Sequence, residues 1–203
     1  MASSDTAIAV EERRKGDSST FVFDYLRHAA AVLEKVRVAE TAHLIDLLRR
    51  AREENRSLFI CGNGGSAATA SHFAAGLGKE GSVGRQRRFR AVALTDNVAW
   101  ITSLANDLDY SRVFVEQLIN HARAGDLLIA FSGSGNSSNI LEAVKWANEN
   151  GLTTIGITSH PGGSLARAAQ HSLCIDSNHI GHVEEAHFIL QHLITYYFAE
   201  GEG

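Results

Sequence analysis

Two short turns rich in glycine and serine carry the residue types in this chain that are best suited to chemistry. They are Gly62-Asn63-Gly64-Gly65-Ser66 and Ser132-Gly133-Ser134-Gly135-Asn136-Ser137. Each turn follows an apolar segment typical of a strand and precedes a segment with helical periodicity. Glycine lets a ligand approach the backbone, serine supplies a hydroxyl, and the first N–H groups of a helix are unpaired. Turns of this kind hold anions, phosphate above all, so a phosphorylated small molecule is the predicted ligand.

One such turn alone would be weak evidence, because glycine and serine also cap helices and form tight turns. Two turns in one small domain strengthen the prediction, and the second, with three serines in six residues, is the stronger. Neither turn has the Gly-Lys-Ser/Thr ending or the G-x-G-x-x-G spacing of common nucleotide-binding loops.

The elements that must position these turns follow from hydrophobic periodicity along the chain. Two helices are expected near 20–37 and 39–55, before the first turn. Strands are expected near 57–61, 90–95, 126–131, 153–158 and 172–176, with helices near 66–77, 97–105, 112–122, 137–150, 163–169 and 183–199. This alternation predicts an α/β fold with a five-stranded parallel sheet and helices on both faces. Both turns then lie at the carboxyl ends of strands, where such sheets bind ligands.

The length, net charge and hydropathy of the chain indicate which broad classes of protein it can belong to. With 203 residues and a formal net charge of −4, the chain is expected to form one domain over 19–203, after a mobile tail at 1–18. The acidic balance gives no footprint for nucleic acid. One local run is basic, Arg85-Gln86-Arg87-Arg88-Phe89-Arg90. We interpret it as a solvated loop, with the alternative that one arginine reaches an anionic substrate.

The sequence has no signal peptide or membrane-spanning run, which predicts a cytoplasmic protein without a membrane partner.

The final helix is apolar on almost every side. Its apolar residues are Ala186, Phe188, Ile189, Leu190, Leu193, Ile194, Tyr196, Tyr197 and Phe198. A helix on the surface of a monomer would have a polar face. The pattern therefore predicts a homo-oligomer in which a partner subunit covers this helix. His179 and His182 are expected in a solvated loop before the helix begins.

Several segments together resemble a known family. They are Cys61-Gly62-Asn63-Gly64-Gly65-Ser66-Ala67-Ala68, His72-Phe73-Ala74-Ala75, Asn106-Asp107, Gly125-Asp126-Leu127-Leu128, Ser134-Gly135-Asn136-Ser137-Ser138-Asn139, Gly162-Gly163 and Glu185-Ala186-His187. From about residue 20 to 198 the chain resembles the sugar isomerase (SIS) domain family, and looks closest to its phosphoheptose isomerase branch. The resemblance implies a flavodoxin-like SIS fold, a phosphosugar ligand, and typically a tetramer with sites between subunits. It also implies aldose–ketose isomerisation through an enediol, with sedoheptulose 7-phosphate as the model substrate.

The resemblance further implies which residues bind the sugar phosphate. In the family, hydroxyls and amides of the two turns hold it, and two further polar positions line the same pocket. The matching residues here are Ser66, Ser132, Ser134 and Ser137 with Gly64, Gly65 and Gly133, and then Asn63 and Asp107.

Two positions depart from the family pattern at the catalytic centre. The isomerases have a glutamate, the general base, one helical turn after the histidine that matches His72, and this chain has Gly76 there. They have a glutamine where this chain has Glu184, eight residues before a second histidine, His192. Our hypothesis is that Glu184 supplies the charge and the base that Gly76 cannot, with His192 as acid or base.

The same cluster holds zinc in some family members, and zinc accepts imidazole nitrogen and carboxylate oxygen. His72, Glu184 and His192 are therefore the candidate metal ligands. Eight residues of helix span ~12 Å, so Glu184 and His192 cannot both reach one ion from one regular helix. One of them must precede the helix or come from another subunit, and His187, three residues after Glu184, is an alternative ligand.

Two classes of function stay open on this pattern. The first is a phosphosugar isomerase, which the two retained histidines favour. The second is a non-catalytic phosphosugar-binding protein that acts as a regulator or partner-binding tetramer, like the replication initiator-associating protein, which resembles the isomerases and lacks the same glutamate. Gly76 favours this second class, and a phosphosugar sensor is a third, weaker alternative.

Overall fold

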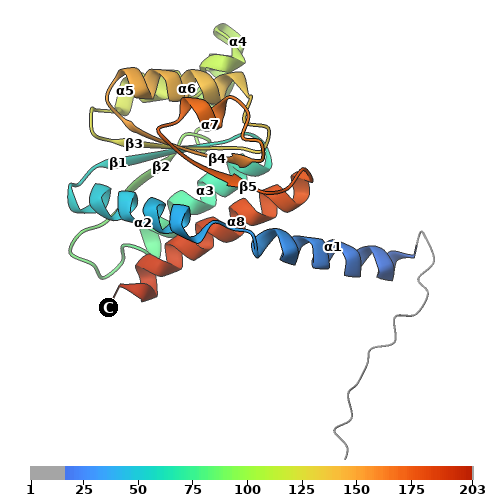
Figure 1. Ribbon diagram of the computed structural model, residues 1–203. Coiled ribbons are helices and arrows are strands. Elements are labelled where there is room, and N and C mark those ends of the chain that lie inside the picture. Colours follow the sequence, from blue (N-terminus) through green and yellow to red (C-terminus); the bar gives the residue numbers. More distant parts are fainter. Residues whose placement is uncertain (1–16, 203) are drawn as a thin grey trace, which may run out of the picture.

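A parallel sheet forms the centre of the structure, a computed structural model that describes residues 17–202 (Figure 1). Its strands are β1 (Ser57–Cys61), β2 (Arg90–Ala93), β3 (Leu127–Ser132), β4 (Thr153–Ser159) and β5 (His171–Ile175). They pair in the order β2-β1-β3-β4-β5, and every pair is parallel. The predicted five-stranded parallel sheet is confirmed. Because the chain winds outward from β1 to β2 and then returns to the other side of β1 as β3, the winding direction switches between β1 and β3.

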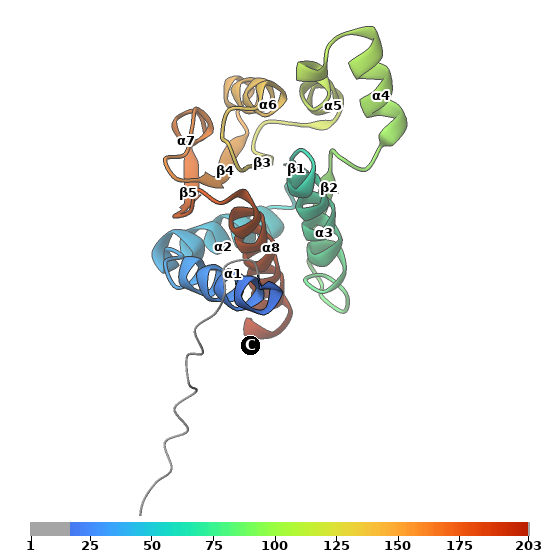
Figure 2. The ribbon, with the colours of Figure 1, turned by 90° about the vertical axis from the view of Figure 1, so that its right-hand side faces the viewer.

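Helices lie on both faces of this sheet (Figures 1 and 2). The α-helices of the described residues are α1 (Ser18–Leu33), α2 (Val38–Glu53), α3 (Gly65–Lys79), α4 (Val98–Asp107), α5 (Val115–His121), α6 (Ser138–Glu149), α7 (Leu165–Ala168) and α8 (Ile180–Tyr196). α2, α3 and α8 cover one face, and α5, α6 and α7 cover the other. This layering agrees with the expectation from the alternating pattern.

The centre of the sheet is buried on both faces, which explains why its strands are continuously apolar. Side chains alternate along a strand, so Leu58 and Ile60 of β1 enter the core against α2, α3 and α8. Phe59 and Cys61 enter the core against α5 and α6 on the other side. All six residues of β3 are buried as well. The turns that follow β1 and β3 therefore start from strands that are buried on both faces.

The predicted N-terminal helical pair is present as α1 and α2, although α1 contributes no buried residue. Asp17 caps α1 by accepting a hydrogen bond from the Thr20 amide at 3.2 Å. The rest of the predicted tail before Ser18 lies outside the described residues. The assignment of 19–203 to one domain stays a prediction. Within the described chain, no helix has both the length and the apolar character that crossing a bilayer requires.

The final helix begins three residues earlier than predicted, at Ile180. His179 is its N-cap and accepts a hydrogen bond from the His182 amide at 3.3 Å. His182 is consequently inside the helix and only 7% exposed, with Nδ1 at 3.2 Å from Glu185 Oε2. Its ring packs at 4.3 Å from that of Tyr25 in α1. The expectation of a solvated His182 is wrong, because docking of α1 buries this turn, while His179 is exposed as expected.

Candidate functional site

The two glycine- and serine-rich turns meet at the carboxyl edge of the sheet, over the switch point between β1 and β3. Cys61 at the end of β1 pairs with Ala130, and β3 continues from there to Ser132, so both turns leave the sheet at its carboxyl edge, the second slightly farther along. Two amide side chains join them: Asn63 Nδ2 donates to Asn139 Oδ1 at 3.0 Å, and Asn139 Nδ2 donates to Asn63 Oδ1 at 2.8 Å. The Tyr110 hydroxyl donates to the same Asn63 oxygen at 3.1 Å. These hydrogen bonds hold the first turn next to the start of α6, the helix that follows the second turn.

The second turn is folded by its own hydroxyls. The Gly135 amide donates to Ser132 Oγ at 3.1 Å, and the Asn136 amide donates to Ser134 Oγ at 3.2 Å. Gly135 has a φ of +64°, and a Cβ there would lie 2.2 Å from the Gly162 carbonyl oxygen, so only glycine fits. Ser137 is the N-cap of α6 but makes no capping bond with its side chain. Its hydroxyl and the first amides of α6 are therefore available to an anion.

The first turn has Glu184 of α8 as a close neighbour. A Cβ on Gly65 would lie 2.5 Å from Glu184 Oε2 and 2.7 Å from Oε1, so the carboxylate lies directly against this backbone. Gly65 is the first residue of α3, whose N-terminus favours negative charge. Ser66 beside it is buried at 4% exposure. A carboxylate oxygen is thus placed next to the turn that we expect to hold the sugar.

The two histidines of the predicted cluster are brought together. Nε2 of His72 and Nε2 of His192 lie 2.8 Å apart, joining α3 to α8. The Phe188 ring packs against both imidazoles, with centroids at 5.0 and 4.9 Å. His72 is exposed and His192 is half-buried, so the pair lies at the surface of the chain.

Glu184 does not join this histidine pair within one chain. α8 is continuous from Ile180 to Tyr196, so Glu184 and His192 are separated by ~12 Å of helix. Across residues 17–202, no three His, Cys, Asp or Glu side chains lie close enough together to hold a metal ion. A single chain therefore does not bring His72, Glu184 and His192 together, as the rise of the helix indicated, and a set completed by another subunit stays a prediction.

His187 does not replace Glu184 as a ligand. It is fully buried and points toward the sheet, with Nε2 at 3.4 Å from the Thr158 carbonyl oxygen and its ring 5.6 Å from that of Phe131. Burial lowers the pKa of His187 to about 4, so the imidazole is neutral at pH 7. His187 is a core residue of the α8–sheet contact.

Gly76 lies in the same contact between α3 and α8, one helical turn beyond His72. A Cβ there would lie 2.9 Å from Thr195 Oγ1 and 3.1 Å from Thr195 Cγ2. The Thr195 hydroxyl is buried and has no hydrogen-bond partner in the described part of the chain. The space that a glutamate side chain would enter at position 76 is therefore occupied by Thr195.

Asp107 is the predicted pocket residue with the weakest link to the turns. It ends α4, a helix without buried residues, and accepts a hydrogen bond from the neighbouring Asn106 at 2.8 Å. Sequence reasoning, in turn, gave no role to Asn139 or Tyr110, which the structure connects to Asn63. Asn139 could have been found from its place in the helix that follows the second turn, whereas Tyr110 had no local signal.

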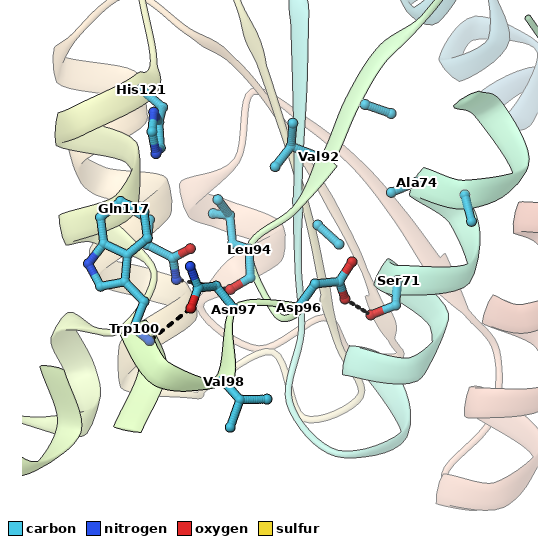
Figure 3. A pocket seen from close by; sticks show the side chains of 13 residues that line it. Ser71, Ala74, Val92, Leu94, Asp96, Asn97, Val98, Trp100, Gln117 and His121 are labelled. Atoms are coloured by element: carbon cyan, nitrogen blue, oxygen red, sulfur yellow. Dashed lines mark hydrogen bonds between the residues drawn. The ribbon is translucent and has the colours of Figure 1, made fainter. Parts of the chain in front are cut away.

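A separate cavity of about 700 Å³ lies between α3, the edge strand β2 and the helices α4 and α5 (Figure 3). Ser71 donates a hydrogen bond to Asp96 on one side, and the Trp100 ring and His121 stand on the other. None of the predicted site residues lines this cavity. The turns, and not this cavity, are the candidate site.

Comparison with known proteins identifies relatives with similar sequence and the same fold. A family model described as SIS domain matches residues 24–159. Phosphoheptose isomerase of Aliarcobacter butzleri is 40% identical over 143 residues, which cover 70% of this chain and 75% of that protein. Phosphoheptose isomerase of Mycobacterium tuberculosis is 43% identical over 138 residues, covering 68% and 70%. The structure of phosphoheptose isomerase from Neisseria gonorrhoeae superposes with a TM-score of 0.81 at 31% identity, covering 89% of this chain and 97% of that one.

Proposed function

We propose, on the premise that this chain belongs to the SIS domain family and to its phosphoheptose isomerase branch, that it interconverts a ketose phosphate and an aldose phosphate. Sedoheptulose 7-phosphate is the leading substrate, because the named relatives are phosphoheptose isomerases. The observation that carries the proposal is the pair of turns locked together by Asn63 and Asn139 over the switch point. Two turns held together in this way, with the N-terminus of a helix after each, suit a small phosphorylated ligand.

The two turns divide the substrate between them in this proposal. The phosphate lies at the second turn, where Ser134, Ser137 and the N-terminus of α6 offer donors. The sugar lies at the first turn, against the backbone of Gly64 and Gly65, with Asn63, Ser66 and Asp107 as the further polar contacts. Ser132 and Gly133 shape the second turn, since Ser132 Oγ already accepts from the Gly135 amide.

Isomerisation needs a base that removes a proton from the carbon beside the carbonyl and an acid that protonates the carbonyl oxygen. We assign the base to Glu184, whose carboxylate lies against Gly65 at the sugar turn. His192 is the second catalytic group, and ~12 Å of α8 separates the two within one chain. The proposed site therefore pairs Glu184 of one chain with the partner subunit's His192.

A homo-oligomer, and by family resemblance a tetramer, follows from the same proposal. Large apolar side chains are exposed on α8 around the histidine pair, namely Phe188 at 37%, Ile189 at 43%, Leu193 at 46% and Tyr196 at 48%. On α1, Phe21 is 69% and Leu26 is 63% exposed. Exposed apolar surface of this extent is typical of an interface. Sedimentation velocity is expected to give an assembly of four chains, and a monomer at micromolar concentration would contradict the shared site.

The proposed reaction does not require zinc. Catalytic zinc commonly has three protein ligands, and at the predicted site one chain brings together two imidazoles, those of His72 and His192. The residues of one chain do not fit the ion by themselves, so no step of the proposed reaction passes through a metal. A third donor would have to come from a neighbouring subunit. Activity that is the same with added zinc and with a chelator would remove the metal from the proposal.

Deuterium exchange tests the proposed function directly. In heavy water, the protein is expected to introduce deuterium at the carbon beside the carbonyl of sedoheptulose 7-phosphate, observed by NMR with and without zinc. This exchange reports proton abstraction itself, whichever isomer is favoured at equilibrium. Binding of the phosphosugar without exchange would instead support the non-catalytic regulator, the function that the loss of a carboxylate at Gly76 favours.

A further inference from the structure

A second cavity lies at the amino edge of the sheet, at the opposite end of β1 from the two turns. It has a volume of about 500 Å³ and is lined by Arg52, Asn55, Gln86, Arg87, Arg88 and Arg90. Asn55 precedes β1 and Arg90 begins β2, so the cavity lies where these two strands start. At about 3.3 Å per residue, β1 places roughly 13 Å between this edge and the turns. No arginine of the cavity can therefore reach a substrate held at the turns of the same chain.

The lining of this cavity is strongly positive. It consists of four guanidinium groups and two side-chain amides, without a carboxylate among the described lining residues. Arg88 and Arg90 are exposed, and neither forms an ion pair in the described part of the chain. Arg87 donates to the Glu53 carbonyl oxygen at 2.6 Å, which orients its guanidinium without neutralising the charge. Within the run from Arg85 to Arg90, three arginines are exposed as expected and line this one cavity, namely Arg87, Arg88 and Arg90. Phe89 is instead buried, and Arg85 is half-buried and donates to the Ala199 carbonyl oxygen at 3.1 Å.

Arg52 lines the cavity, and its guanidinium group is held in place by its neighbours. Its side chain is only 10% exposed and lies between the rings of Phe89 and Phe198, each centroid 5.1 Å from the guanidinium carbon. Nη2 donates to Glu202 at 2.6 Å, while Nη1 is buried without a hydrogen-bond partner in the described chain. A buried charged donor without a partner is costly, and Arg52, which lines the cavity, keeps one unmet hydrogen-bond donor in the described chain.

The nearby carboxylate does not balance this charge. Glu202 is shared by Arg52 at 2.6 Å, Arg49 at 3.2 Å and Arg85 at 3.6 Å. Three guanidinium groups thus share Glu202, and one of them, Arg49, is also paired with Asp46. The arginines on the open side of the cavity, Arg87, Arg88 and Arg90, form no ion pair in the described part of the chain. The local excess of positive charge contrasts with the net charge of −4 of the whole chain.

We propose that this cavity binds a small anion with two or more phosphate groups, at a site separate from the substrate pocket. Guanidinium groups bind phosphate oxygens in pairs, and several of them around one cavity suit more than one phosphate. The described lining includes no aromatic ring on which a base could stack, which argues against a single-stranded nucleic acid as the occupant. The inference does not depend on the proposed isomerase activity, because the cavity lies at the other edge of the sheet.

The test uses the purified oligomer and inorganic pyrophosphate as the probe, in isothermal titration calorimetry at constant ionic strength. Pyrophosphate is expected to bind, and the double variant Arg88→Gln/Arg90→Gln to bind about 100-fold more weakly, about tenfold for each guanidinium lost. Arg50→Gln is the matched control, since Arg50 is an exposed arginine of α2 that does not line the cavity. Deuterium exchange on the sugar phosphate is expected to be the same in the double variant as in the unmodified protein.

Four outcomes would overturn the proposal. Pyrophosphate affinity that the double variant retains would show that these arginines do not form the site. Sulfate binding as tightly as pyrophosphate, or an equal loss in Arg50→Gln, would show general electrostatic attraction. Loss of pyrophosphate binding in Ser134→Ala/Ser137→Ala would show that the probe occupies the substrate turn instead. Failure of the exchange experiment alone would count against the isomerase activity and leave this site unaffected.

Discussion

Replacing Glu184 with glutamine is expected to lower deuterium exchange on the sugar phosphate by about 10²–10⁴-fold, the usual effect of losing a general base. Glutamine has the same shape, so its packing against Gly65 is retained while the negative charge is lost. Because the change removes proton abstraction and not the phosphate contacts, kcat should fall while phosphosugar binding, measured by chemical-shift change, stays within a few-fold.

The matched control for this experiment is Glu149→Gln, an exposed glutamate at the end of α6 on the surface of the molecule. Its exchange rate should equal that of the unmodified protein. An unaltered rate in Glu184→Gln would end the hypothesis that Glu184 replaces the missing carboxylate. The base would then have to be sought elsewhere, beginning with the His72–His192 pair.

Introducing a carboxylate at position 76 should create a zinc site, but only when the facing residue is made smaller. In Gly76→Glu, the new Cβ would lie 2.9 Å from Thr195 Oγ1, and overpacking of this kind costs about 1–3 kcal/mol. In Gly76→Glu/Thr195→Ala, the nearest remaining atom of that residue is Cβ, at 3.6 Å, an ordinary contact. Side chains on a helix lean toward its N-terminus, so the carboxylate would point back toward His72 and His192.

The double variant Gly76→Glu/Thr195→Ala is expected to bind zinc at least 100-fold more tightly than the unmodified protein, measured by competition with a chromogenic chelator. A third ligand completes the donor set of an open zinc site, which is the reason for the large effect. Gly78→Glu is the control, because Gly78 is exposed and a Cβ there meets no atom within 4 Å. Equal zinc affinity in the double variant and in Gly78→Glu would contradict the prediction.

The fold was predictable because its signals are local. The buried strands have continuous apolar runs, and the observed β1 and β3 begin within one residue of the predicted positions. The start of α8 was not predictable from periodicity, since it depends on the cap at His179 and on α1 packing over His182. The contact of Tyr25 with His182 joins residues more than 150 positions apart, which no local pattern reveals.

The residues of the candidate site were predictable from the sequence, but the way in which they lie relative to one another was not. The turns follow from residue type, and the approach of His72 to His192 agrees with the family resemblance. The place of Glu184 depends on the register between α3 and α8, which no local pattern encodes. The amide pair of Asn63 and Asn139 was missed for the same reason, because it links segments 76 positions apart.

The two glycines that face α8 couple pairs of positions on the two helices, but they do so in different ways. With Gly65 against Glu184 and Gly76 against Thr195, each glycine leaves room for a side chain of α8 to come close. At Gly76 the neighbour is a short β-branched side chain that cannot swing away, so an added side chain is accommodated without strain only together with a smaller residue at position 195. At Gly65 the neighbour is the end of a flexible glutamate, so an added side chain would displace the carboxylate of Glu184 and leave the helix packing in place. A substitution at Gly65 is therefore a way to move the proposed base without changing residue 184.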